Sequence, residues 1–127
     1  MIELLTFAIG KPDFDKEYMI SFENGTVYAE ILNQNGHSSR KTIVPKDYGE
    51  KLTPFENIGI YSWHKNYYVE PQYFKDNDIN WALQYKEVGK NCRSISGYGK
   101  FPDNFGKLLN AVHNVFPSFK YKDYIKN

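Results

Sequence analysis

Residues 18–32 read YMISFENGTVYAEIL and set the architecture of this chain. Polar and apolar side chains alternate on both sides of Asn24-Gly25, a pattern typical of a β-hairpin with a type I′ turn. A two-residue turn fixes how the two strands pair, and this pairing predicts one apolar face: Phe22 with Val27, Ile20 with Ala29, and Tyr18 with Ile31. The turn and the hydrophobic pattern therefore predict the same register.

Further strands are expected on both sides of this hairpin. Residues 2–9 are a short apolar run followed by a Gly-Lys-Pro breaker, and they predict an N-terminal strand. Side chains alternate again over residues 79–85, and a turn near 88–91 with a return strand over 92–98 predicts a second hairpin. The polar residues 33–42 are expected to form a loop.

Two helices are expected in addition to the strands. The C-terminal helix has Pro102 at its first helical position, ends before Pro117, and shows apolar residues at helical spacing: Phe105, Leu108, Leu109, Val112, Val115 and Phe116. A weaker helix is expected near residues 46–58, with Pro54 interrupting it. This shorter helix is expected to bury Leu52, Phe55 and Ile58.

We therefore expect one α+β domain that spans residues 1–127. In it, an antiparallel sheet of about five strands, formed by the two hairpins and the N-terminal strand, packs against the C-terminal helix. A second, short broken helix completes the domain. Residues 118–127 are rich in charge and are expected to form a loosely ordered tail.

The composition excludes several classes of protein. Hydrophobic residues make up 41% of the 127 residues and the net charge is +1, which argues against a disordered chain and against a highly cationic nucleic-acid binder. The single cysteine, Cys92, excludes a disulfide scaffold. No run approaches the roughly 18 apolar residues of a membrane span. The first residues lack the features of a signal peptide, so we expect a cytoplasmic protein.

One motif raises the question of a metal. Four residues match ligand positions of an EF-hand calcium loop: Asp76, Asp78, Asn80 and Glu87. The position that needs a glycine for a sharp turn is Trp81, whose bulky side chain disfavours the required backbone conformation. We favour a polar turn that leads into a strand at Ile79. The three histidines are not spaced as zinc ligands, so no metal or cofactor is expected.

Aromatic residues are unusually frequent. The chain has 11 tyrosines, 9 phenylalanines and 2 tryptophans, and nine of these residues fall within residues 55–85. Five aromatic residues have periodicity that predicts a place in the core: Phe22, Trp81, Tyr85, Phe105 and Phe116. A second group has no clean period and is expected to include partner-binding residues: Tyr61, Trp63, His64, Tyr67, Tyr68 and Tyr73.

These features predict a non-enzymatic protein-binding module, such as an immunity or inhibitor protein of bacterial or phage origin. Its partner and oligomeric state stay open, and no catalytic residue is assigned. A first alternative is a small enzyme with a dispersed site that uses His64 or Cys92, although an unpaired cysteine is more often a small core residue. A second alternative is single-stranded nucleic acid stacked on the aromatic segment, with Lys65 and Lys75 at its backbone. The near-neutral charge argues against this alternative.

Residues 52–116 also resemble a pattern of small bacterial proteins, chiefly from Firmicutes. The shared motifs are Trp-x₃-Tyr at 63–67, Trp-x-Leu-x-Tyr at 81–85, and Gly97 followed by Phe-Pro-Asp-Asn-Phe at 101–105 before an apolar helix. The resemblance covers about half of the chain, and Asp76-Asn77 departs from the Asp-Gly turn of the pattern. It implies a folding module, with Trp81 and Tyr85 beneath the helix, and it implies no activity.

Overall fold

The computed structural model describes residues 2–10, 16–33, 38–43, 46–70, 79–117 and 119. The strands are β1 (Ile2–Gly10), β2 (Lys16–Glu23), β3 (Thr26–Asn33), β4 (Ser38–Ile43), β5 (Asn66–Tyr68), β6 (Asn80–Glu87) and β7 (Arg93–Tyr98). The helices are α1 (Tyr48–Glu56), the short 3₁₀ helix η1 (Ile60–Ser62) and α2 (Phe105–Val115).

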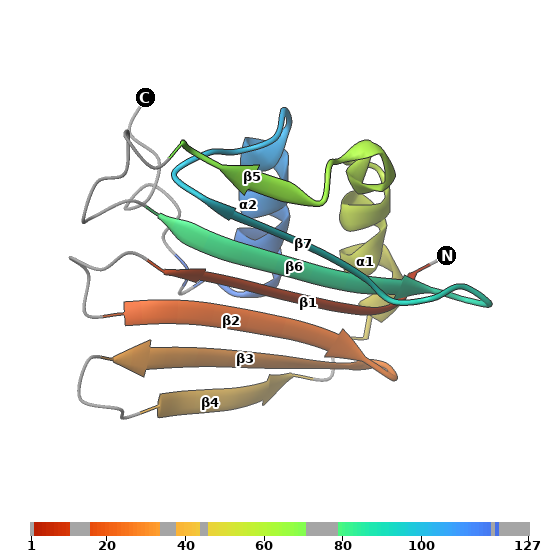
Figure 1. Ribbon diagram of the computed structural model, residues 1–127. Helices are drawn as coiled ribbons and strands as arrows, with labels where there is room; N and C mark the ends of the chain where they lie inside the picture. Colours follow the sequence, from red (N-terminus) through yellow and green to blue (C-terminus); the bar gives the residue numbers. More distant parts are fainter. Residues whose placement is uncertain are drawn as a thin grey trace.

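The seven strands form one sheet in the order β4-β3-β2-β1-β6-β7-β5, with the N-terminal strand at its centre. Helices α1 and α2 lie on the same side of this sheet (Figure 1). The side turned away from them is called the outer face below. The expected α+β class is confirmed, but the expected sheet of about five antiparallel strands is wrong in detail. The sheet has seven strands and is mixed, because β5 runs parallel to β7.

The first hairpin has the predicted register. Phe22 pairs with Val27, and Glu23 pairs with Thr26 next to the turn. Asn24 and Gly25 have φ angles of 50° and 80°, the left-handed conformations that a type I′ turn requires. The side chains of Phe22 and Val27 are fully buried on the helix side of the sheet. The prediction from turn chemistry and alternation is therefore confirmed.

Both strands that sequence reasoning missed lie at the edges of the sheet. Strand β4 overlaps residues 33–42, which were expected to form a loop, and it pairs with β3. Strand β5 has only three residues and pairs with β7 alone. An edge strand has one strand neighbour, so it does not need the apolar pattern by which a central strand is recognised.

The helices confirm the predicted apolar faces but correct the predicted boundaries. All six apolar residues predicted for the C-terminal helix are buried. The helix begins at Phe105 and not at Pro102, because Asn104 before it has a left-handed φ of 69°. Helix α1 continues through Pro54, so the predicted break is wrong. Pro54 lies two residues from the end of the helix, and Leu52, Phe55 and Ile58 are buried as expected.

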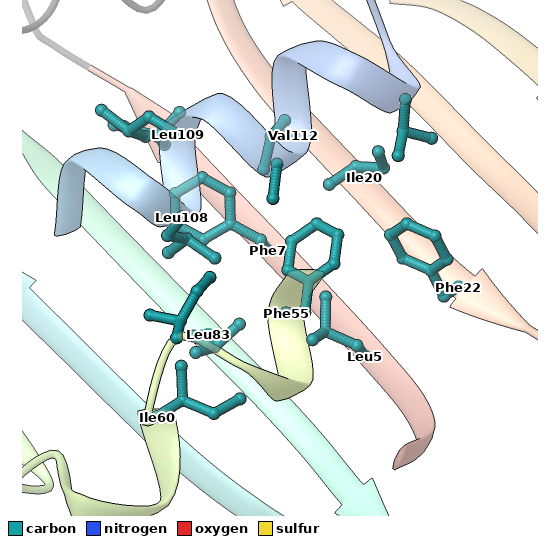
Figure 2. Close-up of a cluster of buried hydrophobic side chains, with 14 of the residues drawn as sticks. Leu5, Phe7, Ile20, Phe22, Phe55, Ile60, Leu83, Leu108, Leu109 and Val112 are labelled. Carbon is teal, nitrogen blue, oxygen red and sulfur yellow. The ribbon is translucent and has the colours of Figure 1, made fainter. Parts of the chain in front are cut away.

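The core fills the space between the sheet and the helices. Figure 2 shows Phe7 of β1 near Leu108 of α2, and Leu5 of β1 near Phe55 of α1. The five aromatic residues predicted to be core are all buried. Phe119 is fully buried as well, and its ring packs edge-to-face on Tyr18 with 5.0 Å between centroids. At this residue the predicted loose tail is wrong, and the rest of 118–127 lies outside the described residues.

The second hairpin bears on the EF-hand match and corrects the expectation for Cys92. Asn80 and Glu87 are the first and last residues of the extended strand β6. At roughly 3.3 Å per residue they lie too far apart to ligate one calcium ion, while Asp76 and Asp78 lie outside the described residues. Cys92 is exposed in the turn, because β7 begins one residue later, and it is not the core residue that was expected. None of the described helices is long and apolar enough to cross a membrane.

Candidate binding site

The chain from η1 to β5 carries five of the six predicted partner-binding residues, and Tyr73 lies outside the described residues. This segment starts where Gly59, with a φ of 89°, turns the chain out of α1. The Ser62 hydroxyl donates a hydrogen bond to the Gly59 carbonyl oxygen at 2.8 Å and closes the turn. From there the segment runs along the edge of the sheet to β5 (Figure 1).

Trp63 belongs to the core rather than to an exposed surface. Its side chain is only 5% exposed, and its ring packs edge-to-face on Trp81 with 6.2 Å between centroids. Phe105 at the start of α2 lies on another side, at 6.4 Å. The expectation that Trp63 stands out as a surface anchor is therefore corrected. Its burial has no sequence signal, because the residues that cover it are distant along the chain.

Tyr67 and His64 form the next turn of the segment. The Tyr67 hydroxyl accepts a hydrogen bond from the His64 backbone N–H at 2.8 Å, and the two rings are 5.9 Å apart. Tyr67 also packs against Trp81, at 5.9 Å. Tyr67 is therefore half-buried and positioned by the core, whereas the side chain of His64 is exposed.

The two most exposed tyrosines of the segment face different sides of the sheet. Tyr61 is 39% exposed and packs edge-to-face on Tyr85 of the helix side. Burial raises the pKa of Tyr61 above its usual value, and the carboxylates of Glu87 and Glu56 raise this pKa further. Tyr68 is 50% exposed and shares a 2.6 Å hydrogen bond with the Ser96 hydroxyl on the outer face.

Arg93, a residue that sequence reasoning missed, ties this segment to the sheet. Its guanidinium donates hydrogen bonds to the Tyr61 carbonyl oxygen at 2.8 Å, to the Tyr85 hydroxyl at 3.1 Å, and to the Trp63 carbonyl oxygen. The planar fork of an arginine can serve several acceptors in different directions. Arg93 therefore determines where Tyr61 and Trp63 lie relative to β6.

We expect Arg93→Lys to lower the free energy of unfolding by about 1–3 kcal/mol, because a lysine ammonium cannot reach all three oxygens and leaves acceptors unsatisfied. Urea unfolding measures the change, and hydrogen exchange is expected to rise at residues 61–63. Lys90→Ala is the control, since Lys90 is exposed and pairs only with Glu87. A change for Arg93→Lys no larger than that of the control would contradict this role.

A pocket of about 390 Å³ opens where this segment meets the connection between β7 and α2. Its lining comes from two short stretches of the chain: Ser62, Trp63, His64 and Tyr67 from the first, and Phe101, Pro102, Asp103 and Asn104 from the second. Three predicted site residues thus meet four residues that the sequence indicated only as the start of a helix. Asn104 ties the second stretch to the turn after α1, because its side-chain amide donates to the Ile58 carbonyl oxygen at 3.4 Å.

A second depression, of about 420 Å³, lies on the outer face and is lined by Thr6, Met19, Ser21, Glu23, Tyr28 and Glu30. The hydroxyl oxygens of Thr6 and Ser21 are 3.1 Å apart there. Cys92 lines neither of these two pockets, so His64 and Cys92 share no cavity in them. Within the described ranges, no group of three histidine, cysteine, aspartate or glutamate side chains is placed to hold a metal ion.

Comparisons with known proteins add no relative. No protein-family model matches the sequence, and no curated protein matches it. The resemblance to small Firmicutes proteins therefore stays a prediction, and the site must be interpreted from its own geometry.

Proposed function

We propose that the protein is a non-catalytic module that binds a protein partner at the β5 edge of its sheet. One observation carries this proposal. The exposed large aromatic side chains of the described residues are Tyr61, Tyr68 and Phe101, and all three lie in the two stretches that meet at this edge. Exposed aromatic residues supply most of the binding energy in many interfaces. Their concentration at one edge, with Tyr61 on its helix side and Tyr68 on its outer face, therefore favours a partner that contacts both sides of this edge.

The contacts that hold these three side chains in place also favour binding. Tyr61 is held from below by Tyr85 and through its backbone by Arg93. The Tyr68 hydroxyl is fixed on Ser96. Phe101 packs on Phe105 of α2, with 4.9 Å between ring centroids. Side chains that are already ordered lose little conformational entropy when a partner binds, which strengthens the complex.

The finer proposal is that this module is an inhibitor or immunity protein of bacterial or phage origin. Such a protein acts by occupying a surface of its target, so it needs a preorganised contact surface and no catalytic group. The proposed edge has this character, because the supports of Tyr61 and Tyr68 come from the folded sheet itself.

The test compares two variants of the immobilised protein as baits for an extract of the source cells. Tyr61→Ser/Tyr68→Ser removes two exposed rings at the proposed edge. Val88→Ser is the matched control, because Val88 is an exposed apolar residue in the turn between β6 and β7. We expect the unaltered protein and the control to retain one protein at a fixed stoichiometry, and the double variant to bind it at least about tenfold more weakly.

Two results count against this proposal. If the double variant retains the same protein as well as the unaltered chain does, the edge is not the contact surface. If no protein is retained by any of the three baits, the protein-binding function itself is contradicted. Circular dichroism of each variant checks that the fold is intact, so a lost contact is not confused with unfolding.

A further inference from the structure

The indole N–H of Trp63 has no acceptor in the described part of the chain, although the residue itself is buried. The indole N–H of the other tryptophan, Trp81, donates to the Lys100 carbonyl oxygen at 3.1 Å. The Trp63 side chain is 95% removed from solvent and lines the 390 Å³ pocket. Every described side-chain nitrogen that is shielded from solvent has a hydrogen-bond partner. Because the Trp63 Nε1 atom has no such partner, it must be accessible to solvent. Because Trp63 lines this pocket, its indole N–H is available to an acceptor atom of a ligand bound there.

The same pocket offers an acceptor and flat apolar surfaces. The exposed carboxylate of Asp103 belongs to its lining, and a carboxylate accepts hydrogen bonds from N–H donors. The rings of Phe101 and Tyr67 supply aromatic faces in the same lining. A ligand that satisfies all of these groups is flat and has both an acceptor and an N–H donor on its edge.

Size and charge narrow the choice of ligand. A volume of about 390 Å³ falls within the size range of small-molecule binding sites. The pocket can therefore hold a ligand larger than a single side-chain amide group. Two exposed lysines adjoin the lining in sequence, Lys65 after His64 and Lys100 before Phe101, and a third, Lys107, follows three residues after Asn104 in the first turn of α2. The surroundings of the pocket therefore favour a ligand whose outer part carries negative charge.

We propose that this pocket binds the base of a mononucleotide. An acceptor atom of the base faces Trp63 Nε1–H, an N–H donor faces Asp103, the ring lies against Phe101, and the phosphate lies toward the lysines. A single nucleotide fits better than a nucleic-acid strand, because a net charge of +1 provides little attraction for a long phosphate backbone. Phe101 belongs to both proposed surfaces, but the two proposals are tested separately, because the variants used here change neither Tyr61 nor Tyr68.

The experiment is an NMR titration of the whole chain with AMP, GMP, CMP and UMP, with inorganic phosphate and ribose 5-phosphate as controls. We expect at least one mononucleotide to bind with a Kd below about 1 mM and to shift the Trp63 indole N–H signal. The two control compounds are expected to leave that signal in place, since neither has a base.

Two variants test the assigned contacts. Asp103→Asn preserves the shape of an exposed side chain and removes its charge, and Trp63→Phe removes the indole donor. Each is expected to weaken binding by about tenfold, because Trp63→Phe loses a hydrogen bond and Asp103→Asn replaces a charge-assisted hydrogen bond with a weaker neutral one. Val88→Ser, far from the pocket in sequence, is expected to bind as the unaltered chain does. Asp103→Asn decides the question if Trp63→Phe proves too unstable to titrate.

Several results would overturn the inference. These are the absence of mononucleotide binding at millimolar concentration, an equal shift of the Trp63 signal by inorganic phosphate, or unchanged affinity in Asp103→Asn. Tighter binding of oligonucleotides with a steep salt dependence would also overturn it, in favour of a strand-binding surface. None of these results bears on the protein-binding edge, which is tested with different residues.

Discussion

Trp81→Ala is expected to lower the free energy of unfolding by about 3–5 kcal/mol, the range for removing a large aromatic side chain from a core. Trp81 is 3% exposed and lies at the junction of the core and the pocket. Its ring contacts Phe105 at 4.9 Å, Tyr67 at 5.9 Å and Trp63 at 6.2 Å between centroids. The variant would leave a cavity beneath all three rings, together with a Lys100 carbonyl oxygen that has lost its indole donor.

Urea unfolding followed by far-UV circular dichroism is the appropriate measurement, because the substitution removes one of the two tryptophans on which fluorescence depends. Val88→Ala serves as the control, since Val88 is exposed and its truncation should change stability by less than about 0.5 kcal/mol. If Trp81→Ala unfolded at the same urea concentration as this control, the packing described around Trp81 would be incorrect.

The parts of the fold that sequence reasoning recovered are those determined by neighbouring residues. The turn at Asn24-Gly25 depends on backbone conformations that these two residues favour, and alternation on either side fixes the register. Helix α2 is recognised in the same way, because its apolar residues recur at helical spacing. In both elements local preference and burial point to the same structure.

The parts that were missed depend on contacts between distant residues. Strand β4 is polar and β5 is three residues long, so neither has an apolar pattern, and each is defined by the strand it pairs with. Trp63 is buried because Trp81 and Phe105 come to meet it. No local rule distinguishes such a tryptophan from an exposed one in an irregular segment.

Only part of the candidate site was predicted, because the rest also depends on contacts between distant residues. Its first half, His64 and Tyr67 with Trp63, lies in the aromatic segment that the composition had already made conspicuous. Its second half follows β7, and long-range contacts such as the parallel pairing of β5 with β7 bring that connection beside the first. Arg93 could have been suspected as one of only two arginines, but its three acceptors are two backbone carbonyls and a tyrosine, which sequence does not indicate.

Gly97→Ala is the second substitution for which we expect a large loss of stability, of about 3 kcal/mol, at the upper end of the usual range for overpacking. A Cβ atom at this position would lie 2.5 Å from Trp81 Nε1 and 2.7 Å from the Tyr67 carbonyl oxygen. Neither neighbour can move easily, because Trp81 is enclosed by the core and Tyr67 is paired with Gly97 in the sheet. The added methyl group would therefore push β5 away from β7.

Gly106→Ala is a control for which stability is expected to rise rather than fall. Gly106 lies in the first turn of α2, and a Cβ atom there would meet nothing within 4 Å. Replacing a helical glycine with alanine is expected to raise stability by about 0.5–1 kcal/mol. The two substitutions add the same methyl group. The difference between their free energies of unfolding therefore measures the effect of the close packing of β5, β6 and β7 around Gly97.

Urea unfolding of both variants gives the two free energies, and amide shifts of Tyr67 and Tyr68 report whether β5 has moved. Because Tyr67 and Trp63 line the pocket next to this contact, the displacement of β5 should also disturb the pocket. Equal stability of Gly97→Ala and the unaltered chain would show that β5 does not pack against Trp81 as described. The pocket would then lose the wall that Tyr67 provides.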